Sequence, residues 1–359
     1  MTLLAQERKG SPSLDELLDP GRVFVKSIKA SDSVLLVHHA DVDGFASGAL
    51  FDLAMKSSGI ARVDMRASDV EGLKGILSQV KAGEYDVVIV LDIDMPAANS
   101  EYERLGVKTL VVDHHMVRAG YAPNVVYVNP RLADPDAYQP VSYVAYKMLR
   151  GFGRIADMEW LAALGSVADF AFKDCRDVLD KWIGIESVDE LTGTDMWEVS
   201  KVLFGAIILS FIPSENISAR QIIDVLENSK NPKDVVSSEV ISYASLRFNE
   251  TYAQVKKQFW DNAETRGRVV VGIIDTPYRR IGSAVVTDIS VERKDSAVFL
   301  LSRRGDQYRV SARWQNSPVH LGEFMAEHFG GGGHRNAAGG SISEPQLAEF
   351  KERVFSELA

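Results

Sequence analysis

Histidine and aspartate side chains cluster where a long apolar run ends, in the sequence VLLVHHADVDGFASGAL from Val34 to Leu50. The run is typical of a buried strand that leads into a turn and a helix. Residues two apart in an extended chain point to the same side, so His39, Asp41 and Asp43 could converge on one point. Carboxylates that lie so close together repel each other, and a shared proton or a cation usually relieves the repulsion. We therefore predict that this stretch supplies half of a metal site.

Further residues of the same types follow two other apolar runs and occur in one apolar segment. Asp92 follows DVVIVL, the triplet Asp113, His114 and His115 follows VKTLVV, and Asp169 lies within LAALGSVADFAF, which we predict to be helical. An aspartate at a strand end is often structural, since it caps a turn or faces solvent. A carboxylate in an apolar helix is costly to bury without a partner, although it could also face solvent. Three acidic strand ends together with such a helix favour a functional site.

The candidate ligands are mainly carboxylate oxygens, with two or three imidazoles. Such a set suits Mn²⁺ or a comparable hard divalent ion. A cysteine-rich zinc site is excluded, because Cys175 is the only cysteine. The ligands are too many for one ion, and two ions roughly 3.5–4 Å apart would share a bridging carboxylate and polarise a phosphoryl oxygen. We therefore predict hydrolysis of a phosphoester.

A second group of candidate residues lies near the end of the chain, in GGGGHRNAAGG at residues 330–340 and in the preceding RVSARW. Glycines let backbone N–H groups approach a phosphate closely, and an arginine can clamp phosphate oxygens in bidentate fashion. The alternatives are a flexible turn for the glycines and a surface charge for the arginine on the strand. The candidate substrate-binding residues are Arg313, Gly332, Gly333, His334 and Arg335.

The elements that would position the first group alternate between strand and helix. Ser13 could cap a short helix through Leu18, which Pro20 and Gly21 would end. The predicted strands are 34–37, 61–67, 86–91, 107–112 and 125–128, and the predicted helices are 45–58, 70–80, 142–150 and 157–172. Alternation of this kind is typical of an open parallel sheet, whose sites lie at the carboxyl ends of its strands.

The pattern of predicted secondary structure changes twice in the second half of the chain. From Asp180 to Glu264 the sequence is helix-like, with breaks at Pro213 and Pro232, and no motif indicates a function. After it we predict strands at 269–274, 297–301 and 308–312 and helices at 281–289 and 321–329. The predicted fold is α/β, with a brace at 1–20, a doubly wound, mainly parallel domain at 21–180, a helical connector at 181–266 and a smaller α/β domain at 267–359. We expect the active site in the cleft between the two α/β domains.

Composition narrows the class of protein. With 46% hydrophobic and 25% charged residues, the chain has the composition of an ordinary globular protein. The net charge of −10 argues against broad electrostatic binding to nucleic acid or to an anionic membrane. A nucleic-acid substrate would therefore need a local basic groove or would have to be short. The single cysteine, and the lack of a signal-peptide core or a run of about 20 apolar residues, predict a cytoplasmic protein that does not enter the membrane.

Taken in order, these motifs resemble those of the DHH phosphoesterase superfamily. HADVDG, the strand end at Asp92, the triplet DHH and GSVAD resemble its catalytic domain, and RVSAR with GGGGHRNAAGG resembles its C-terminal DHH-associated domain of the first type. The resemblance implies two Mn²⁺ ions, for which Mg²⁺ or Co²⁺ could substitute. The implied ligands are His39 and Asp41 for one ion, Asp43, His114 and Asp169 for the other, and Asp92 as the bridge.

The resemblance also assigns roles to the remaining residues. His115 would contact the scissile phosphate, and Asp113 would orient a histidine of the site. Asp94 is a near neighbour of Asp92, but the spacing from the strand end favours Asp92 as the bridge. In the C-terminal domain, Arg313 and the His334–Arg335 pair would bind the nucleotide or phosphate end of the substrate.

The spacing of the first motif resembles RecJ-like members of the superfamily, which implies a Mn²⁺-dependent phosphodiesterase or exonuclease acting on single-stranded DNA or RNA or on short oligonucleotides. An alternative is a nanoRNase, a 3′-phosphoadenosine-5′-phosphate phosphatase or a cyclic dinucleotide phosphodiesterase, which the acidic charge favours. A RecJ-like replication scaffold that binds the GINS complex is a third hypothesis, and the complete set of six candidate ligands disfavours it. The oligomeric state, the polarity of digestion and the choice of DNA or RNA do not follow from the sequence.

Overall fold

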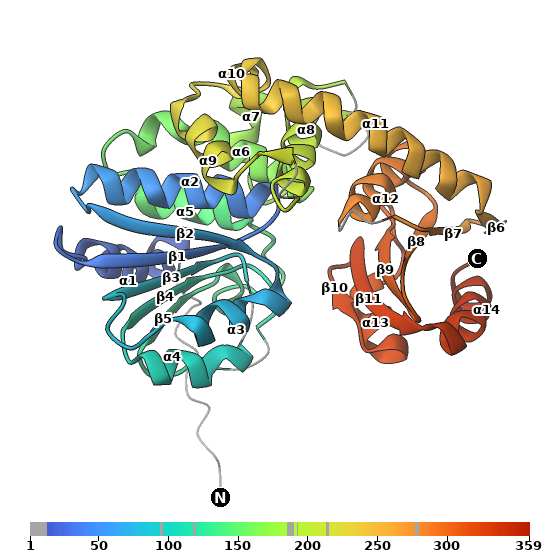
Figure 1. Ribbon diagram of the computed structural model, residues 1–359, viewed down its shortest axis with the longest axis horizontal. Helices are drawn as coiled ribbons and strands as arrows, with labels where there is room; N and C mark the ends of the chain where they lie inside the picture. The colour runs from blue at the N-terminus through green and yellow to red at the C-terminus, as the bar shows by residue number, and fades with distance from the viewer. Residues whose placement is uncertain are drawn as a thin grey trace, which may run out of the picture. The chain divides into compact units, whose positions relative to one another are not determined.

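The computed structural model describes residues 13–93, 96–117, 120–184, 190–191, 193–212, 215–276 and 280–359. The chain forms two compact units, which we call the first and the second unit (Figure 1). The first unit comprises Met1–Ser200 and Ile217–Ile241, and the second comprises Lys201–Asn216 and Ser242–Ala359. The stretch predicted as a helical connector is thus divided between the two units.

A five-stranded sheet forms the centre of the first unit, and all its strands are parallel. In the sheet the strands follow the order β2-β1-β3-β4-β5. Their bounds are β1 Ser33–His39, β2 Arg62–Ser68, β3 Val87–Leu91, β4 Lys108–Val112 and β5 Val125–Val128. The order reverses between β1 and β3, and in open α/β sheets ligands bind beside the carboxyl ends of the strands at such a reversal. The parallel sheet predicted from the apolar runs is confirmed.

Helices cover both faces of this sheet (Figure 1). On one face lie α2 Val42–Ser57, α5 Val141–Leu149 and α6 Glu159–Ala168, and on the other lie α3 Val70–Gln79 and α4 Asn99–Leu105. Leu35, Val37, Val88 and Val90 point into the core beneath α3 and α4. The sheet is therefore doubly wound, as predicted, although α4 was not predicted because its seven residues are mostly polar.

The N-terminal helix continues beyond Pro20 and Gly21, where the prediction ended it. It is α1 Leu14–Lys26, and it packs on α5 and β5. A Cβ atom on Gly21 would lie 2.3 Å from the Met148 sulfur, so this glycine lets the helix approach α5 closely. A proline removes one backbone hydrogen bond from a helix. Burial of the residues that follow Pro20 compensates for this loss of stability.

The second unit contains a six-stranded mixed sheet in the order β10-β11-β9-β8-β7-β6, in which β7 and β8 are parallel and the other neighbours antiparallel. Its strands are β6 Glu264–Arg266, β7 Val269–Ile274, β8 Ala297–Arg304, β9 Gln307–Arg313, β10 Gly332–Gly333 and β11 Ala337–Ser343. Its helices include α12 Ile281–Glu292, α13 Leu321–Phe329 and α14 Leu347–Leu358. Trp314 is 1% exposed and packs in the core, so it is not available to stack on a base.

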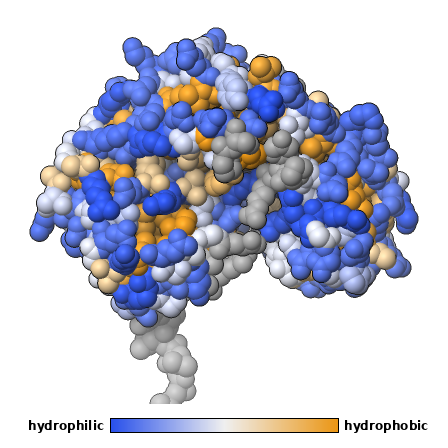
Figure 2. Space-filling model, viewed as in Figure 1, coloured by the Kyte–Doolittle hydropathy of each residue, from blue (hydrophilic) through white to orange (hydrophobic). Residues whose placement is uncertain are grey.

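The remaining helices lie between the two sheets in sequence. They are α7 Arg176–Trp182, α8 Asp195–Leu209, α9 Ala219–Asn228, α10 Pro232–Ser237 and α11 Glu239–Asp261. Pro232 occupies the first turn of α10, in agreement with its predicted role as a break, whereas Pro213 lies outside the described residues. Within the described part of the chain, every helix is too short or too polar to pass through a bilayer. Hydrophilic residues dominate the face shown in Figure 2, with hydrophobic residues in separate patches.

Candidate metal centre

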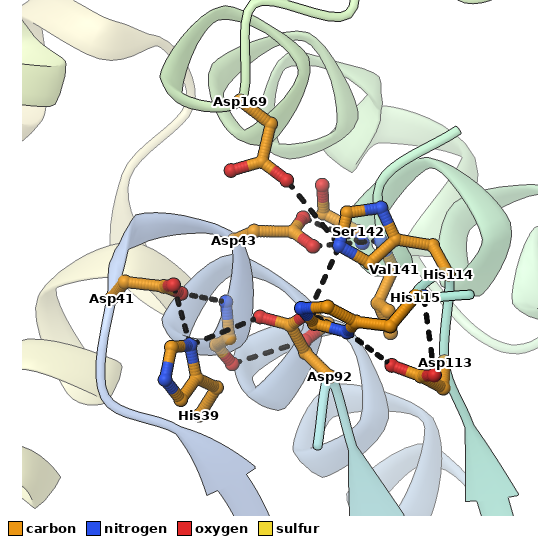
Figure 3. A network of polar contacts seen from close by, with 12 residues as sticks. His39, Asp41, Asp43, Asp92, Asp113, His114, His115, Val141, Ser142 and Asp169 are labelled. Atoms are coloured by element: carbon orange, nitrogen blue, oxygen red, sulfur yellow. Dashed lines mark hydrogen bonds and ion pairs between the residues drawn. The ribbon is translucent and has the colours of Figure 1, made fainter. Parts of the chain in front are cut away.

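The carboxyl ends of β1, β3 and β4 bring the candidate ligands together in the first unit (Figure 3). The two histidines that end β1 point to opposite faces of the sheet. His38 is buried against Phe45, with the two ring centroids 4.6 Å apart, and its Nδ1–H donates to the His39 carbonyl at 2.9 Å. Burial lowers the pKa of His38 to about 4. His38 is thus a neutral core residue, and His39 is left to face the acidic cluster.

One group of donor atoms consists of His39, Asp41 and Asp92, whose ligand atoms all lie within 4.8 Å of one another. His39 Nδ1 lies 2.5 Å from Asp41 Oδ2 and 3.4 Å from Asp92 Oδ2. The other oxygen of Asp41 accepts the N–H of Gly44 at 2.9 Å and so caps α2. Burial alone would lower the pKa of His39, but the Asp41 carboxylate outweighs this effect and the pKa rises to about 10.

A second group consists of Asp43, His114 and Asp169, whose ligand atoms also lie within 4.8 Å of one another. His114 Nε2 is 3.5 Å from Asp169 Oδ2 and 3.3 Å from Asp92 Oδ1. Asp43 is completely buried and accepts two backbone N–H groups at the start of α5, from Val141 at 2.7 Å and Ser142 at 2.8 Å. The N-terminus of α5 therefore fixes this carboxylate in place.

Asp92 stands between the two groups. Its Oδ2 faces His39 in the first group, and its Oδ1 faces His114 in the second (Figure 3). Its backbone has φ 63°, in the left-handed region that residues other than glycine adopt at a cost of about 1–3 kcal/mol. A strained backbone that aims one carboxylate at two sets of donors indicates a functional constraint at this position.

Electrostatic repulsion in the cluster calls for a cation. Burial and the neighbouring Asp92 raise the pKa of Asp43 to about 7. Burial, followed by the charges of Asp43, Asp41 and Asp92, also raises the pKa of Asp169. The donor set of oxygens and imidazole nitrogens, with carboxylates that resist ionisation next to one another, fits hard divalent ions such as Mn²⁺.

Asp169 is not inside a helix, which corrects the prediction. The helix α6 ends at Ala168, and Asp169 is its C-cap residue. Phe170 then adopts φ 57°, which turns the chain away from the helix axis. The end of the helix thus presents the Asp169 carboxylate to the cluster. The apolar residues around it gave no signal of this turn, because a phenylalanine with positive φ is rare.

The DHH triplet contains a separate histidine–aspartate pair. Asp113 is fully buried, and its two oxygens lie 2.7 Å from His115 Nδ1 and 3.1 Å from the His115 backbone nitrogen. Burial would lower the pKa of His115, but Asp113 raises it to about 9. Burial would raise the pKa of Asp113, and the charge of His115 holds it below its ordinary value. Asp113 therefore orients the ring of His115.

Comparison with known proteins agrees with this architecture. Residues 267–359 match the family model of the DHHA1 domain. The chain is 26% identical over 193 residues to the single-stranded-DNA-specific exonuclease RecJ of Escherichia coli K12, in an alignment that covers 46% of this chain and 33% of that protein. The chain thus spans about a third of the length of this curated relative.

Two solved structures show the same fold. RecJ of Thermus thermophilus in complex with Mn²⁺ has a TM-score of 0.70 at 18% identity, over 98% of this chain and 55% of that one. A manganese-bound exonuclease RecJ has a TM-score of 0.62 at 18% identity, over 99% of this chain and 96% of that one. The chain therefore has the fold of these RecJ structures, and its residues 267–359 match the DHHA1 domain.

The second group of candidate residues lies in the DHHA1 domain. Arg313 ends β9 and pairs in register with Ala337 of β11. The arginine donates to the hydroxyl groups of Thr287 and Ser283, both at 3.1 Å. Backbone N–H groups at the start of α13 donate to the carbonyls of His334 and Arg335, each at 3.0 Å. The structure therefore places this group close together within the second unit.

The glycine run of the DHHA1 domain is ordered, which differs from the flexible turn considered above. Gly332 and Gly333 form β10 and pair with β11. A Cβ atom on Gly331 would lie 2.2 Å from the Gly339 carbonyl oxygen, and Gly333 has φ 138°. Close backbone packing thus explains Gly331 and Gly333 without a ligand, because a side chain on either would separate the two strands.

Two glycines of the DHH motifs have positional roles that the sequence analysis missed. A Cβ atom on Gly44 would lie 2.2 Å from the His39 carbonyl oxygen, and one on Gly165 would lie 2.5 Å from Asp43 Oδ1. Gly165 lies about one helical turn before Asp169, the C-cap residue of α6. That spacing is the signal that could have identified it. Asp94, the neighbour considered as an alternative bridge, lies outside the described residues.

Proposed function

We propose that this chain is a Mn²⁺-dependent phosphodiesterase that removes nucleotides from single-stranded or short nucleic acids. The observation that carries the proposal is the orientation of Asp92, whose two oxygens face two different groups of donor atoms. A carboxylate in this position suits a bridge between two divalent ions. The sequence similarity to RecJ of Escherichia coli supports the choice of a nucleic-acid substrate.

The residues that would hold the ions are His39, Asp41 and Asp92 on one side and Asp43, His114, Asp169 and Asp92 on the other. Bound divalent ions would polarise phosphoryl oxygens and neutralise the charge that builds up on them. Asp113 holds the Nδ1–H of His115 and favours the protonated ring, which leaves Nε2–H to donate to a phosphate oxygen. His115 would thereby stabilise negative charge in the transition state.

The DHHA1 domain would hold the end of the substrate. Its candidate residues are Arg313, Gly332, Gly333, His334 and Arg335. The Arg313 side chain donates hydrogen bonds to two hydroxyl groups, among its other contacts. These hydroxyl groups orient the guanidinium and are uncharged. A guanidinium held in this way suits a phosphate group.

The test is hydrolysis of end-labelled DNA and RNA of graded length, measured with Mn²⁺ and with Mg²⁺. We expect Mn²⁺-dependent release of nucleotides by the wild-type chain and about 1,000-fold slower release by Asp92→Asn. The Asp64→Asn variant, which changes a partly exposed residue of β2, is the matched control and should retain activity. Equal turnover by wild type and Asp92→Asn would refute the proposal.

A second candidate is a phosphodiesterase for short oligonucleotides or dinucleotides, and the net charge of −10 favours it. A long nucleic-acid strand is attracted to a basic groove through its many phosphates. An acidic protein gains little from this attraction. The same panel separates the two functions. Hydrolysis of two- to five-nucleotide substrates without hydrolysis of a long single strand would select the second.

A further inference from the structure

A buried asparagine supports the DHH triplet from the neighbouring strand. Asn129 directly follows β5 and is completely buried. Its side-chain nitrogen donates to the backbone carbonyl of His115 at 2.9 Å and to the hydroxyl of Tyr127 at 2.7 Å. Its side-chain oxygen accepts the backbone N–H of Arg131 at 2.9 Å. One carboxamide thus joins the DHH triplet, β5 and the turn that follows β5.

The same turn holds the other histidine of the triplet. Arg131 lies in the short 3₁₀ helix Pro130–Leu132, and its Nε–H donates to the carbonyl oxygen of His114 at 2.9 Å. A second nitrogen of its guanidinium donates to the Pro135 carbonyl at 2.6 Å. We call Asn129 and Arg131 the β5 clasp. The clasp fixes the two successive carbonyls of His114 and His115, and with them the direction in which both side chains leave the backbone.

A chain of hydrogen bonds runs from the clasp to the ring of His115. Because Asn129 donates to the Tyr127 oxygen, the hydroxyl proton of Tyr127 can point towards Asp113 Oδ2, at 3.4 Å. Asp113 Oδ1 in turn accepts the His115 Nδ1–H at 2.7 Å. Asn129 also donates directly to Asp113 Oδ2 at 3.4 Å, so it reaches the imidazole through the His115 carbonyl, through Asp113 directly, and through Tyr127 and Asp113. Asn129 itself is completely buried, so it can act on the site only through these groups.

We propose that Asn129 is a positioning residue for hydrolysis, which holds His115 in the orientation that contacts the scissile phosphate. The proposal rests on the proposed function. Outer partners of this kind typically change activity by about 10- to 100-fold when they are removed. Because His115 would act mainly on the transition state, loss of Asn129 lowers kcat and leaves KM nearly unchanged.

The chain contains a matched control at the other end of β5. The side-chain nitrogen of Asn124 donates to two backbone carbonyls, those of Tyr102 at 3.0 Å and Val107 at 2.9 Å. Asn124→Ala and Asn129→Ala therefore remove the same chemical group, with two hydrogen-bond partners at Asn124 and four at Asn129. Both variants lose stability, but only Asn129→Ala is expected to lower kcat. Tyr127→Phe provides a milder change, since it removes one hydroxyl and leaves the aromatic ring.

The experiment measures kcat and KM on a short labelled oligonucleotide for these variants, alone and combined with His115→Ala. We expect a kcat about 10-fold or more lower for Asn129→Ala, an intermediate loss for Tyr127→Phe, and no further loss when Asn129→Ala is added to His115→Ala. An unchanged kcat in Asn129→Ala, or a full additional loss in the His115→Ala background, would overturn the proposal. Should Asn129→Ala fail to fold, the kinetics of Tyr127→Phe decide in the same way.

A second measurement does not depend on turnover. In the metal-free protein labelled with ¹⁵N-histidine, the Nδ1–H of His115 should give a protected NMR signal, assigned by its loss in His115→Ala. The signal should weaken or disappear in Asn129→Ala and persist in Asn124→Ala. Absence of hydrolysis by the wild-type chain would refute the proposed function and with it this role. Normal wild-type hydrolysis with unchanged kcat and NMR signal in Asn129→Ala would refute the role alone.

Discussion

The helix α2 carries a cluster of buried carboxylates at each end, and the two clusters are neutralised differently. Near its C-terminus Asp52, which is 1% exposed, lies 3.0 Å from Lys56 Nζ and 2.5 Å from a guanidinium nitrogen of Arg220. Glu227 of α9 contacts the same two cations. Each buried acid in this C-terminal cluster thus has a basic side chain beside it.

At the N-terminus of α2 the carboxylates outnumber the cations that the chain supplies. Among the residues that the structure describes, Asp92 and Asp169 form ion pairs with histidines alone. Asp43 is held by backbone N–H groups of α5. Buried charge of one sign is costly, so the C-terminal cluster is complete by itself whereas the N-terminal cluster requires an external cation. We therefore expect the C-terminal cluster to stabilise the fold and the N-terminal cluster to serve the proposed hydrolysis.

The largest expected effect is on turnover at the N-terminal cluster. Asp92→Asn keeps the side-chain shape and tolerates the positive φ, but it removes the charge between the two donor groups. We expect turnover to fall about 1,000-fold, which corresponds to about 4 kcal/mol of transition-state stabilisation. The free energy of unfolding should stay the same or rise. We expect the opposite result for Asp52→Asn at the C-terminal cluster. Turnover should be retained, and the free energy of unfolding measured in urea should fall by about 2 kcal/mol.

The next largest effect is on stability at the C-terminal cluster. Arg220→Met leaves Asp52 buried with one cation fewer, so the free energy of unfolding should fall by about 3 kcal/mol in urea. Arg22→Met is the matched control, because its partners Asp15 and Asp19 are largely exposed, and it should cost less than about 1 kcal/mol. Similar losses for both variants would show that the C-terminal cluster is no more important than a surface ion pair.

Divalent ions should stabilise the first unit through the N-terminal cluster. At a free Mn²⁺ concentration 100 times the dissociation constant, the free energy of unfolding should rise by about 2.7 kcal/mol. Thermal melting with Mn²⁺ and with a chelator measures this difference. Asp92→Asn should lose the increment, whereas Arg220→Met should keep it in full. An increment that survives in Asp92→Asn would locate ion binding elsewhere.

The smallest expected effect is a pH dependence at the C-terminal cluster. Burial and the neighbouring Asp52 raise the pKa of Glu227 from 4.5 to about 7. Because the carboxyl pKa is higher in the folded state, protonation of Glu227 stabilises the fold. This contribution is complete below pH 4.5, the ordinary pKa, and is lost as the pH rises through 7, the pKa in the folded state. Between pH 5 and 8 the wild type should therefore lose about 1 kcal/mol relative to Glu227→Gln. Urea unfolding across this range tests the sign, and parallel pH profiles would contradict it.

The strands were predictable because their signals are local. Uninterrupted apolar runs such as Val87–Leu91 have few alternatives to a buried strand, and candidate ligands directly follow them. The helix through Pro20 was not predictable, since it depends on packing against Met148 in a distant helix. The same holds for Asp169, whose position depends on a turn at Phe170.

The partners of the site residues were harder to predict than the residues themselves. The motif letters identify Asp43, but only the folded chain shows that the first turn of α5 holds it. Asn129 reads in the sequence as an ordinary turn residue before a proline. Its contact with His115 exists because β5 pairs with β4 in the sheet, a long-range event that no local pattern encodes.

The alternation of His38 and His39 across β1 supplies a pair of spectroscopic reporters. The two rings are adjacent in sequence, yet their pKa values are about 4 and about 10, so one is neutral and the other protonated throughout the neutral range. The imidazole nitrogens of His38 would report on the integrity of the core. Those of His39 would respond when a divalent ion displaces the proton. One labelled sample could then distinguish a variant that fails to bind metal from one that fails to fold.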